Sequence, residues 1–366
     1  MHVAFRVDAS LQIGTGHVMR CLTLADELRR RGARCSFVCR PHEGHLLALV
    51  AQRGHQALAL PELQEGAQPN RNGTEHARWL GTDWTTDAQD TQQALNATTR
   101  CQHVDWLVVD HYALDVRWEH ALRSQATRIM VIDDLADRPH ACDLLLDQNL
   151  GRSAQDYCGL LKGKNNTLIG PQYALLRPEF AALRAQSIAR RQSNTQLSSL
   201  LVTMGGVDKD NATGQVLTEL QSCNLPADLR VTVVMGPHAP WLAQVQAQAT
   251  QMPWHTEVLV GVNNMAQLMA ESDLAIGAAG STSWEFCCLG IPSLLICTAD
   301  NQRTVIAALA SNNASVSLDS FELGQSDCIP FKKQYTRITE NLSIFSATAA
   351  RITDGNGASR VCKEML

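Results

Sequence analysis

The first thirty residues place a strand, a glycine turn and an amphipathic helix in succession. Residues 2–7 form a mostly apolar run, as expected of a strand that is covered on both faces. A polar loop with Gly14 and Gly16 follows, and glycines let such a loop turn sharply and bring its N–H groups near a bound anion. From His17 onward, apolar residues recur at helical spacing until Gly32. This beginning predicts an α/β fold with an imidazole at the edge of an open sheet.

His17 lies in the first turn of the expected helix, where the positive end of the helix dipole favours a neutral imidazole that can act as a base. Two phosphate-binding motifs do not fit this segment. The dinucleotide pattern G-x-G-x-x-G needs a glycine where the chain has Met19, and the Gly-Lys-Ser/Thr ending of the P-loop is absent. An ordinary tight turn that ends in a polar helix-start residue remains an equal alternative on these residues alone.

Length and composition limit the class of protein. A chain of 366 residues is too long for one ordinary core and indicates two domains, which we place at residues 1–190 and 191–366, with the last helix packing back on the first domain. The net charge of −5 offers no basic surface for nucleic acid, and no apolar stretch reaches the ~20 residues needed to cross a bilayer. The twelve cysteines include no C-x-x-C pair and are expected to be reduced core thiols. We therefore expect a cytoplasmic, monomeric protein that binds neither nucleic acid nor membrane.

Strand-like and helix-like segments alternate through both halves, and this pattern builds parallel sheets. Strands are expected at 35–39, 56–60, 106–109, 129–132 and 144–146 in the first half, and at 200–203, 231–235, 258–260, 274–276 and 294–297 in the second. Residues 61–86 are rich in Gly, Asn, Gln and Thr and are expected to form an exposed insertion or a mobile loop. Ligands of open α/β sheets bind beyond the carboxyl ends of the strands, so we expect the loops of the two domains to share a cleft.

The second half contains two glycine turns, and the later one predicts a diphosphate site. Gly205 and Gly206 follow an apolar strand, and a later turn runs from Gly277 to Gly280. Glycines let the backbone approach a ligand, and the hydroxyl residues at the next helix start offer further donors, namely Ser281, Thr282 and Ser283. Glu285, one turn into that helix, suits ribose hydroxyls because a carboxylate accepts two hydrogen bonds at once. A solvent-facing helix residue is the alternative for Glu285.

Other polar residues at strand ends have two interpretations each. Asp208 and Asp210 form a D-x-D pattern typical of a metal site, but they lie between a glycine turn and a helix start, which favours helix capping. We therefore expect no metal and no cofactor. His111 and Tyr112, in V-V-D-H-Y, follow another strand and are candidates for contacts with a substrate hydroxyl or water.

Together these motifs resemble the PseG family of pseudaminic acid biosynthesis. The resemblance rests on R-V-D-A-S-x-x-I-G-T-G-H-V-M-R-C-L-T-L-A, V-D-H-Y, T-M-G-G-V-D-K-D-N and G-A-A-G-S-T-S-W-E-F-C-C-L-G-I-P, which span both halves of the chain. Members are UDP-2,4-diacetamido-2,4,6-trideoxy-β-L-altropyranose hydrolases, related in fold to the MurG-type GT-B glycosyltransferases. The resemblance implies a GT-B fold, with two Rossmann-like domains whose parallel sheets face a central cleft.

The resemblance also implies roles for single residues. His17 would be the catalytic residue, with Tyr112 and Asn301 as further active-site residues and Glu285 as the ribose ligand. It implies substrate contacts for the motif residues Asp8, Gly14, Gly16, Gly205, Gly206, Gly280, Ser281, Thr282 and Ser283. Residues 61–86 receive no function from it.

The implied reaction is hydrolysis of a UDP-sugar at its anomeric carbon in the bacterial cytoplasm. Water would attack opposite the leaving UDP through an oxocarbenium-like transition state, which inverts the configuration. His17 would take a proton from that water, an effect typically worth about 10²–10⁴-fold, and N–H groups at residues 277–283 would stabilise the leaving diphosphate without a metal. Two other functions remain open: a GT-B glycosyltransferase that passes the sugar to an acceptor, and a non-catalytic nucleotide-sugar-binding protein.

Overall fold

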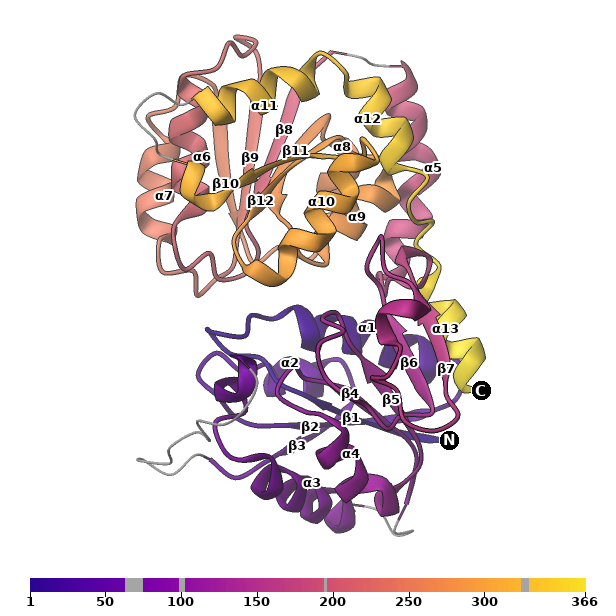
Figure 1. Cartoon of the computed structure of the whole chain (residues 1–366). Helices are drawn as coiled ribbons and strands as arrows, with labels where there is room; N and C mark the ends of the chain where they lie inside the picture. Colours follow the sequence, from indigo (N-terminus) through magenta and orange to yellow (C-terminus); the bar gives the residue numbers. More distant parts are fainter. Residues whose placement is uncertain (63–74, 99–102, 194–195, 324–328) are drawn as a thin grey trace. The chain divides into compact units, whose positions relative to one another are not determined.

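The computed structural model describes residues 1–62, 75–98, 103–193, 196–323 and 329–366, which divide into two compact units (Figure 1). Unit 1 comprises Met1–Leu175 and Ala358–Leu366, and unit 2 comprises Leu176–Gly357. Each unit is built around its own parallel sheet.

Unit 1 contains, within its described residues, seven parallel strands in the order β3-β2-β1-β4-β5-β6-β7. Their bounds are β1 His2–Val7, β2 Arg34–Cys39, β3 Gln56–Ala59, β4 Val104–Asp110, β5 Ala126–Ile132, β6 Leu144–Asp147 and β7 Asn166–Ile169. The strand order reverses between β1 and β4, and ligands of open α/β sheets bind beyond the carboxyl ends of the strands at such a switch point. Val7 is paired with Asp110 there, so the residues that follow β1 lie next to the end of β4.

Helices cover both faces of this sheet. They are α1 Gly16–Arg30, α2 Leu47–Gln52, α3 Trp84–Thr98, α4 Val116–Leu122 and α13 Gly357–Met365, with short 3₁₀ helices η1 Glu75–Leu80, η2 Arg123–Gln125, η3 Ala154–Tyr157 and η4 Pro171–Tyr173. Val3 and Phe5 of β1 belong to one core with α1, α2 and α13. Ala4, between them, belongs to a second core with α3 and α4, because successive strand residues point to opposite faces. Burial on both faces explains the continuous apolar runs of these strands.

Unit 2 contains, in the part that the structure describes, six parallel strands in the order β10-β9-β8-β11-β12-β13. Their bounds are β8 Ser199–Thr203, β9 Arg230–Met235, β10 His255–Val260, β11 Leu274–Ala278, β12 Ser293–Cys297 and β13 Val316–Asp319. The helices are α5 Pro178–Ser193, α6 Ala212–Gln221, α7 Leu242–Ala249, α8 Met265–Glu271, α9 Thr282–Leu289, α10 Arg303–Ser311, α11 Ile329–Thr339 and α12 Leu342–Ala349, with 3₁₀ helices η5 Asp300–Gln302 and η6 Ser320–Glu322. Here the switch point lies between β8 and β11, where Thr203 pairs with Gly277.

The strands predicted from the sequence are present, and two more, β7 and β13, lie at sheet ends. Both extra strands have four residues, and polar side chains occupy half of each: Asn166 and Thr167 in β7, and Ser317 and Asp319 in β13. Their apolar patterns are therefore too weak to recognise. The predicted α/β class itself is confirmed.

The division into units differs from the expected one at residue 190. It falls after Leu175, so α5 belongs to unit 2, where it packs against α8 and α9. Ser187 of α5 donates its hydroxyl to the Leu289 carbonyl of α9 at 2.7 Å. The expected boundary at residue 190 falls inside α5, which continues to Ser193.

The last helix, α13, belongs to unit 1 although the chain reaches it from unit 2. Val361, Cys362 and Met365 lie in the core of unit 1. The indole N–H of Trp106 on β4 also donates to the Met365 carbonyl at 2.9 Å. The first unit is therefore completed by the end of the chain.

Ten of the twelve cysteines lie in the described residues, and these ten form no disulfide. Nine of them are buried and Cys158 is exposed. No helix within the described ranges is both long and apolar enough to cross a membrane.

Candidate functional site

A buried carboxylate holds His17 at the switch point of the first sheet. After β1, the chain turns at Gly14, whose φ of 80° is in the left-handed region, and His17 is the second residue of α1. Its Nδ1 lies 2.6 Å from Oδ1 of Asp110, the last residue of β4, whose side chain is fully buried. A carboxylate accepts hydrogen bonds, so Nδ1 carries the proton and Nε2 keeps its lone pair. An imidazole held in this way by a carboxylate has the arrangement that a general base requires.

Arg20 binds the same carboxylate. It lies one turn after His17 on the same helix face, and its Nε and Nη2 donate to the two oxygens of Asp110, both at 2.7 Å. Although burial opposes ionisation of Asp110, Arg20 and His17 hold the pKa of that carboxyl below its usual range. Asp110 is therefore a stable anion at neutral pH, and it fixes the orientation of the imidazole.

Asp134 extends this network to Tyr112. Nη1 of Arg20 and the hydroxyl of Tyr112 both donate to Oδ2 of Asp134, each at 2.7 Å. The Tyr112 ring meets the His17 ring edge-on, with centroids 4.6 Å apart. Burial, together with the Asp134 carboxylate, raises the pKa of the Tyr112 phenol. Tyr112 is only 4% exposed and its hydroxyl donates to Asp134, so it supports the His17 side chain, and its expected contact with a substrate hydroxyl or water stays a prediction.

Asp8, expected among the substrate contacts, lies in the interior of unit 1. Its side chain is fully buried, and Oδ1 accepts hydrogen bonds from Nη1 of Arg6 and the backbone N–H of Arg40, both at 2.7 Å. Its other oxygen lies 3.4 Å from Nε2 of His111 and 3.6 Å from Nε2 of His42. Asp8 thus joins the ends of β1, β2 and β4 and supports the turn after β1, and its expected substrate contact stays a prediction.

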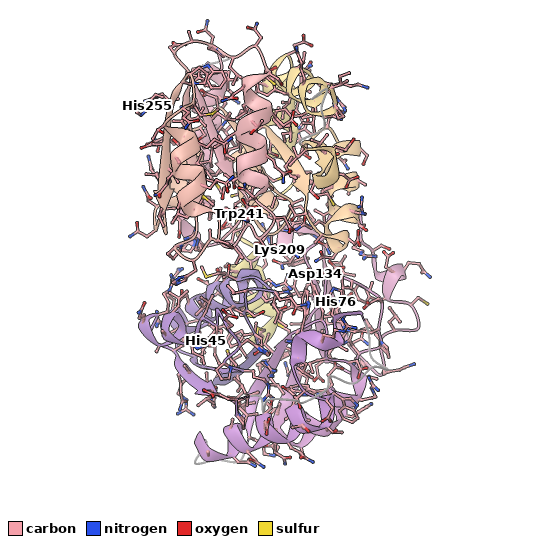
Figure 2. All side chains as sticks on the ribbon, turned by 90° about the vertical axis from the view of Figure 1, so that its left-hand side faces the viewer. His45, His76, Asp134, Lys209, Trp241 and His255 are labelled. Atoms are coloured by element: carbon pink, nitrogen blue, oxygen red, sulfur yellow. The ribbon has the colours of Figure 1, made fainter. Side chains whose placement is uncertain are left out.

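Two aromatic residues of the 61–86 stretch, His76 and Trp79, lie against the His17 network, which comprises His17, Arg20, Asp110, Tyr112 and Asp134. Residues 63–74 of that stretch lie outside the described residues, whereas residues 75–80 form η1. Trp79 stacks on Tyr112, with ring centroids 5.5 Å apart and 26° between the planes. Tyr112 also contacts His76, at a centroid distance of 5.2 Å, and Asp134; Figure 2 labels both partners. His76 and Trp79 are partly covered and Leu80 is buried, so this part of the stretch packs onto unit 1 and is not an exposed insertion.

In unit 2, the N-terminus of α9 lies at the switch point and is open to a ligand. No side chain of the described residues caps this helix. A Cβ on Gly280 would have no atom within 4 Å, whereas a Cβ on Gly277 would stand 2.9 Å from the Thr203 carbonyl oxygen. Gly277 therefore permits close packing of two strands, and Gly280 leaves space in front of the helix. Free N–H groups at a helix N-terminus suit an anion such as a diphosphate.

The N-terminus of α6, after the other glycine turn, is occupied by the protein itself. Oδ1 of Asp208 accepts from the backbone N–H of Ala212 at 2.8 Å, and Oδ2 accepts from Thr213 at 3.0 Å. The capping interpretation is thereby confirmed for Asp208. Gly205, with φ of 84°, and Gly206 are exposed in the turn before this cap.

The three hydroxyl residues at the start of α9 differ in access. Ser281 is exposed and Thr282 is partly exposed, whereas Ser283 is 1% exposed. The backbone N–H of Ser283 donates to the Gly280 carbonyl at 3.0 Å. Ser283 is therefore an interior residue whose ligand contact stays a prediction, and the exposed residues at this end of α9 are Gly280 and Ser281.

Glu285 and Asn301 complete the predicted set in unit 2. The Glu285 side chain is 19% exposed and lies 3.9 Å from Nη2 of Arg177. Burial raises the pKa of Glu285 to about 7, against the opposing effect of Arg177. Asn301 is exposed in η5, after β12, and β12 neighbours β11 in the sheet. Asn301 therefore lies at the same sheet edge as the N-terminus of α9, in a different unit from His17.

Sequence reasoning did not single out Asp110, Arg20 or Trp79. Asp110 ends an apolar strand and directly precedes the candidates His111 and Tyr112, so its position was a usable signal. Arg20 follows His17 by three residues, which places both on one helix face. Trp79 gave no local signal, because its contacts arise from the fold.

Comparisons with known proteins agree with this architecture. Residues 199–323 match the glycosyltransferase family 28 C-terminal domain. The chain is 26% identical over 317 residues to the UDP-2,4-diacetamido-2,4,6-trideoxy-beta-L-altropyranose hydrolase of Campylobacter jejuni, covering 86% of this chain and 98% of that protein. It is 22% identical over 375 residues to the spore coat polysaccharide biosynthesis protein SpsG of Bacillus subtilis, covering 99% and 96%. The MurG structure of Acinetobacter baumannii aligns with a TM-score of 0.68 at 15% identity, covering 100% of this chain and 99% of that chain.

These comparisons confirm the resemblance to the PseG family and the GT-B fold class. Each unit is a Rossmann-like domain with its candidate residues at the switch point of its sheet.

Proposed function

We propose that this protein is a hydrolase that releases UDP from UDP-2,4-diacetamido-2,4,6-trideoxy-β-L-altropyranose. The observation that carries the proposal is the contact of 2.6 Å between His17 and Asp110, which leaves Nε2 of the imidazole as an oriented base. The similarity to the Campylobacter jejuni hydrolase along most of the chain supports the choice of substrate.

In the proposed reaction, Nε2 of His17 removes a proton from a water molecule while the water oxygen bonds to the anomeric carbon. The bond between that carbon and the diphosphate oxygen breaks, and its electron pair leaves with UDP. Attack from the opposite face inverts the configuration at C1. Asp110 stabilises the imidazolium that forms, and it remains ionised because Arg20 donates two hydrogen bonds to it.

Unit 2 holds the nucleotide in this proposal. The N-terminus of α9, which no side chain of the described residues caps, stabilises the negative charge that develops on the leaving diphosphate. Glu285, one turn further along α9, accepts hydrogen bonds from the ribose hydroxyls. Because helix N–H groups carry the charge, this scheme is independent of a metal ion.

A glycosyltransferase is the second candidate, since the family 28 match and the likeness to MurG favour a fold shared with such enzymes. His17 would then take its proton from an acceptor hydroxyl instead of water. The two functions differ in what they need besides the nucleotide sugar, because a hydrolase needs no acceptor.

The test is incubation of the purified protein with the UDP-sugar alone, followed by measurement of UDP and free sugar. We expect His17→Asn to lower kcat by about 10²–10⁴-fold and to leave UDP affinity intact, because the substitution removes the base but not α9. Near-normal turnover in H17N would overturn the proposal. UDP release that requires an added acceptor would identify a glycosyltransferase, and UDP binding without turnover would identify a binding protein.

A further inference from the structure

The Trp79 ring packs against Tyr112, which belongs to the hydrogen-bonded network around His17. Tyr112 is 4% exposed, and its hydroxyl donates to Asp134 at 2.7 Å. The Trp79 ring stacks on Tyr112 and also meets the His17 ring edge-on, with centroids 6.4 Å apart. Trp79 itself is partly exposed. A partly exposed tryptophan therefore lies close to the proposed base.

The η1 helix holds this indole in a fixed position. His76 meets the Trp79 ring edge-on at a centroid distance of 4.5 Å. Leu80, the next residue after Trp79, is 2% exposed and lies in the core that includes Ala88 and Leu95 of α3. The Trp79 ring is thus held between His76 and Tyr112. An aromatic side chain that packing holds in place is suited to recognition, because it loses little conformational entropy when a ligand binds.

The charged groups that contact His17 or Tyr112 bind one another. Asp110 and Asp134 both accept hydrogen bonds from Arg20, and Tyr112 donates to Asp134. The hydrogen-bonding groups of Arg20, Asp110 and Asp134 are thus engaged within the protein, whereas the Trp79 ring adds an apolar surface close to His17.

We propose that Trp79 is a specificity-determining residue that forms the apolar contact surface for the sugar beside His17. The inference rests on the proposed function and deepens it. A 2,4-diacetamido-2,4,6-trideoxy sugar carries a methyl group at C6 and two acetyl methyl groups, and an indole surface binds such groups well. A fully hydroxylated sugar lacks all three methyl groups and should gain less from Trp79.

The experiment measures the affinities of UDP-sugar and of UDP by calorimetry in the His17→Asn background, where substrate is not consumed. The ratio of these affinities reports the contribution of the sugar. We expect the added substitution Trp79→Ala to reduce UDP-sugar affinity about 10-fold with UDP affinity unchanged, and Trp79→Phe to restore most of the loss.

Trp84 provides the matched control. It is the first residue of α3, and its indole lies 5.5 Å from the Arg117 guanidinium. Trp84→Ala should leave the affinity ratio unchanged, and thermal unfolding checks that each variant is folded.

Two results would overturn the inference: an unchanged ratio in folded Trp79→Ala, or an equal loss of affinity for UDP and UDP-sugar. A third result has a different meaning. If the H17N protein binds every UDP-sugar no more tightly than it binds UDP, the proposed function is contradicted independently of Trp79.

Discussion

Asp110→Asn tests whether the carboxylate orients His17. Asparagine has nearly the shape of aspartate, but it is neutral and its amide can donate a hydrogen bond to Nδ1. With a donor at this position, the imidazole carries its proton on Nε2 and is no longer a base towards water. Arg20 also loses the carboxylate that accepts two of its hydrogen bonds. We therefore expect losses in both turnover and stability.

The structure sets the size of both losses. General base catalysis is worth about 10²–10⁴-fold in kcat, or about 3–5 kcal/mol of transition-state stabilisation. The Asp110 side chain is fully buried and Arg20 is 10% exposed, so breaking this pair costs about 3–5 kcal/mol of folding stability. In a domain the size of unit 1, each kcal/mol lowers Tm by roughly 2–4 °C, which gives a decrease of about 6–20 °C.

The assay combines kcat and Tm, with Asp134→Asn as the control. Asp134 accepts a hydrogen bond from Arg20 at 2.7 Å, as Asp110 does, but its other partner is the Tyr112 hydroxyl rather than His17. Both variants should be less stable, and kcat should fall much further in D110N when both are measured below their melting transitions. If D110N and D134N had the same kcat, the orienting role of Asp110 would be refuted.

Three further predictions concern unit 2. Gly280→Val should leave Tm unchanged, because a Cβ at this position would meet no atom within 4 Å. The added side chain should weaken UDP binding about 10-fold or more, because it blocks the N-terminus of α9. Normal UDP affinity in calorimetry would contradict the diphosphate site. UDP affinity should rise about tenfold between pH 6 and pH 8, because Glu285, with a pKa of about 7, ionises in this range and then accepts hydrogen bonds from the ribose hydroxyls. Glu285→Gln should flatten this pH profile relative to the wild type. Parallel profiles in the two proteins would exclude Glu285 as the ribose ligand. Turnover should be the same with and without a metal chelator, because helix N–H groups are proposed to stabilise the leaving group; a loss that added Mg²⁺ restores would contradict this.

Local patterns predicted the parts of the fold that depend on neighbours in sequence. The apolar run of β1, the positive φ of Gly14 and the helical spacing after His17 are all properties of short segments. The same reasoning missed β7, whose burial depends on its place at the end of the sheet.

The candidate site was only partly predictable because its contacts join distant segments. His17 and Asp110 are 93 residues apart, and they meet because β1 and β4 are neighbours in the sheet. Asp8 lies in a recognisable motif, yet its burial results from Arg6 together with two histidines from other loops. The packing of Trp79 on Tyr112 likewise depends on how η1 folds onto the unit.

His17 is proposed to direct water to the anomeric carbon. The product that receives the water oxygen tests this step directly. The reaction is run in ¹⁸O-labelled water, and the products are examined by NMR before the free sugar can change its anomeric form. We expect the label on C1 of the sugar, with inverted configuration, and no label in the released UDP. Label in the UDP would mean attack at phosphorus and would contradict the account.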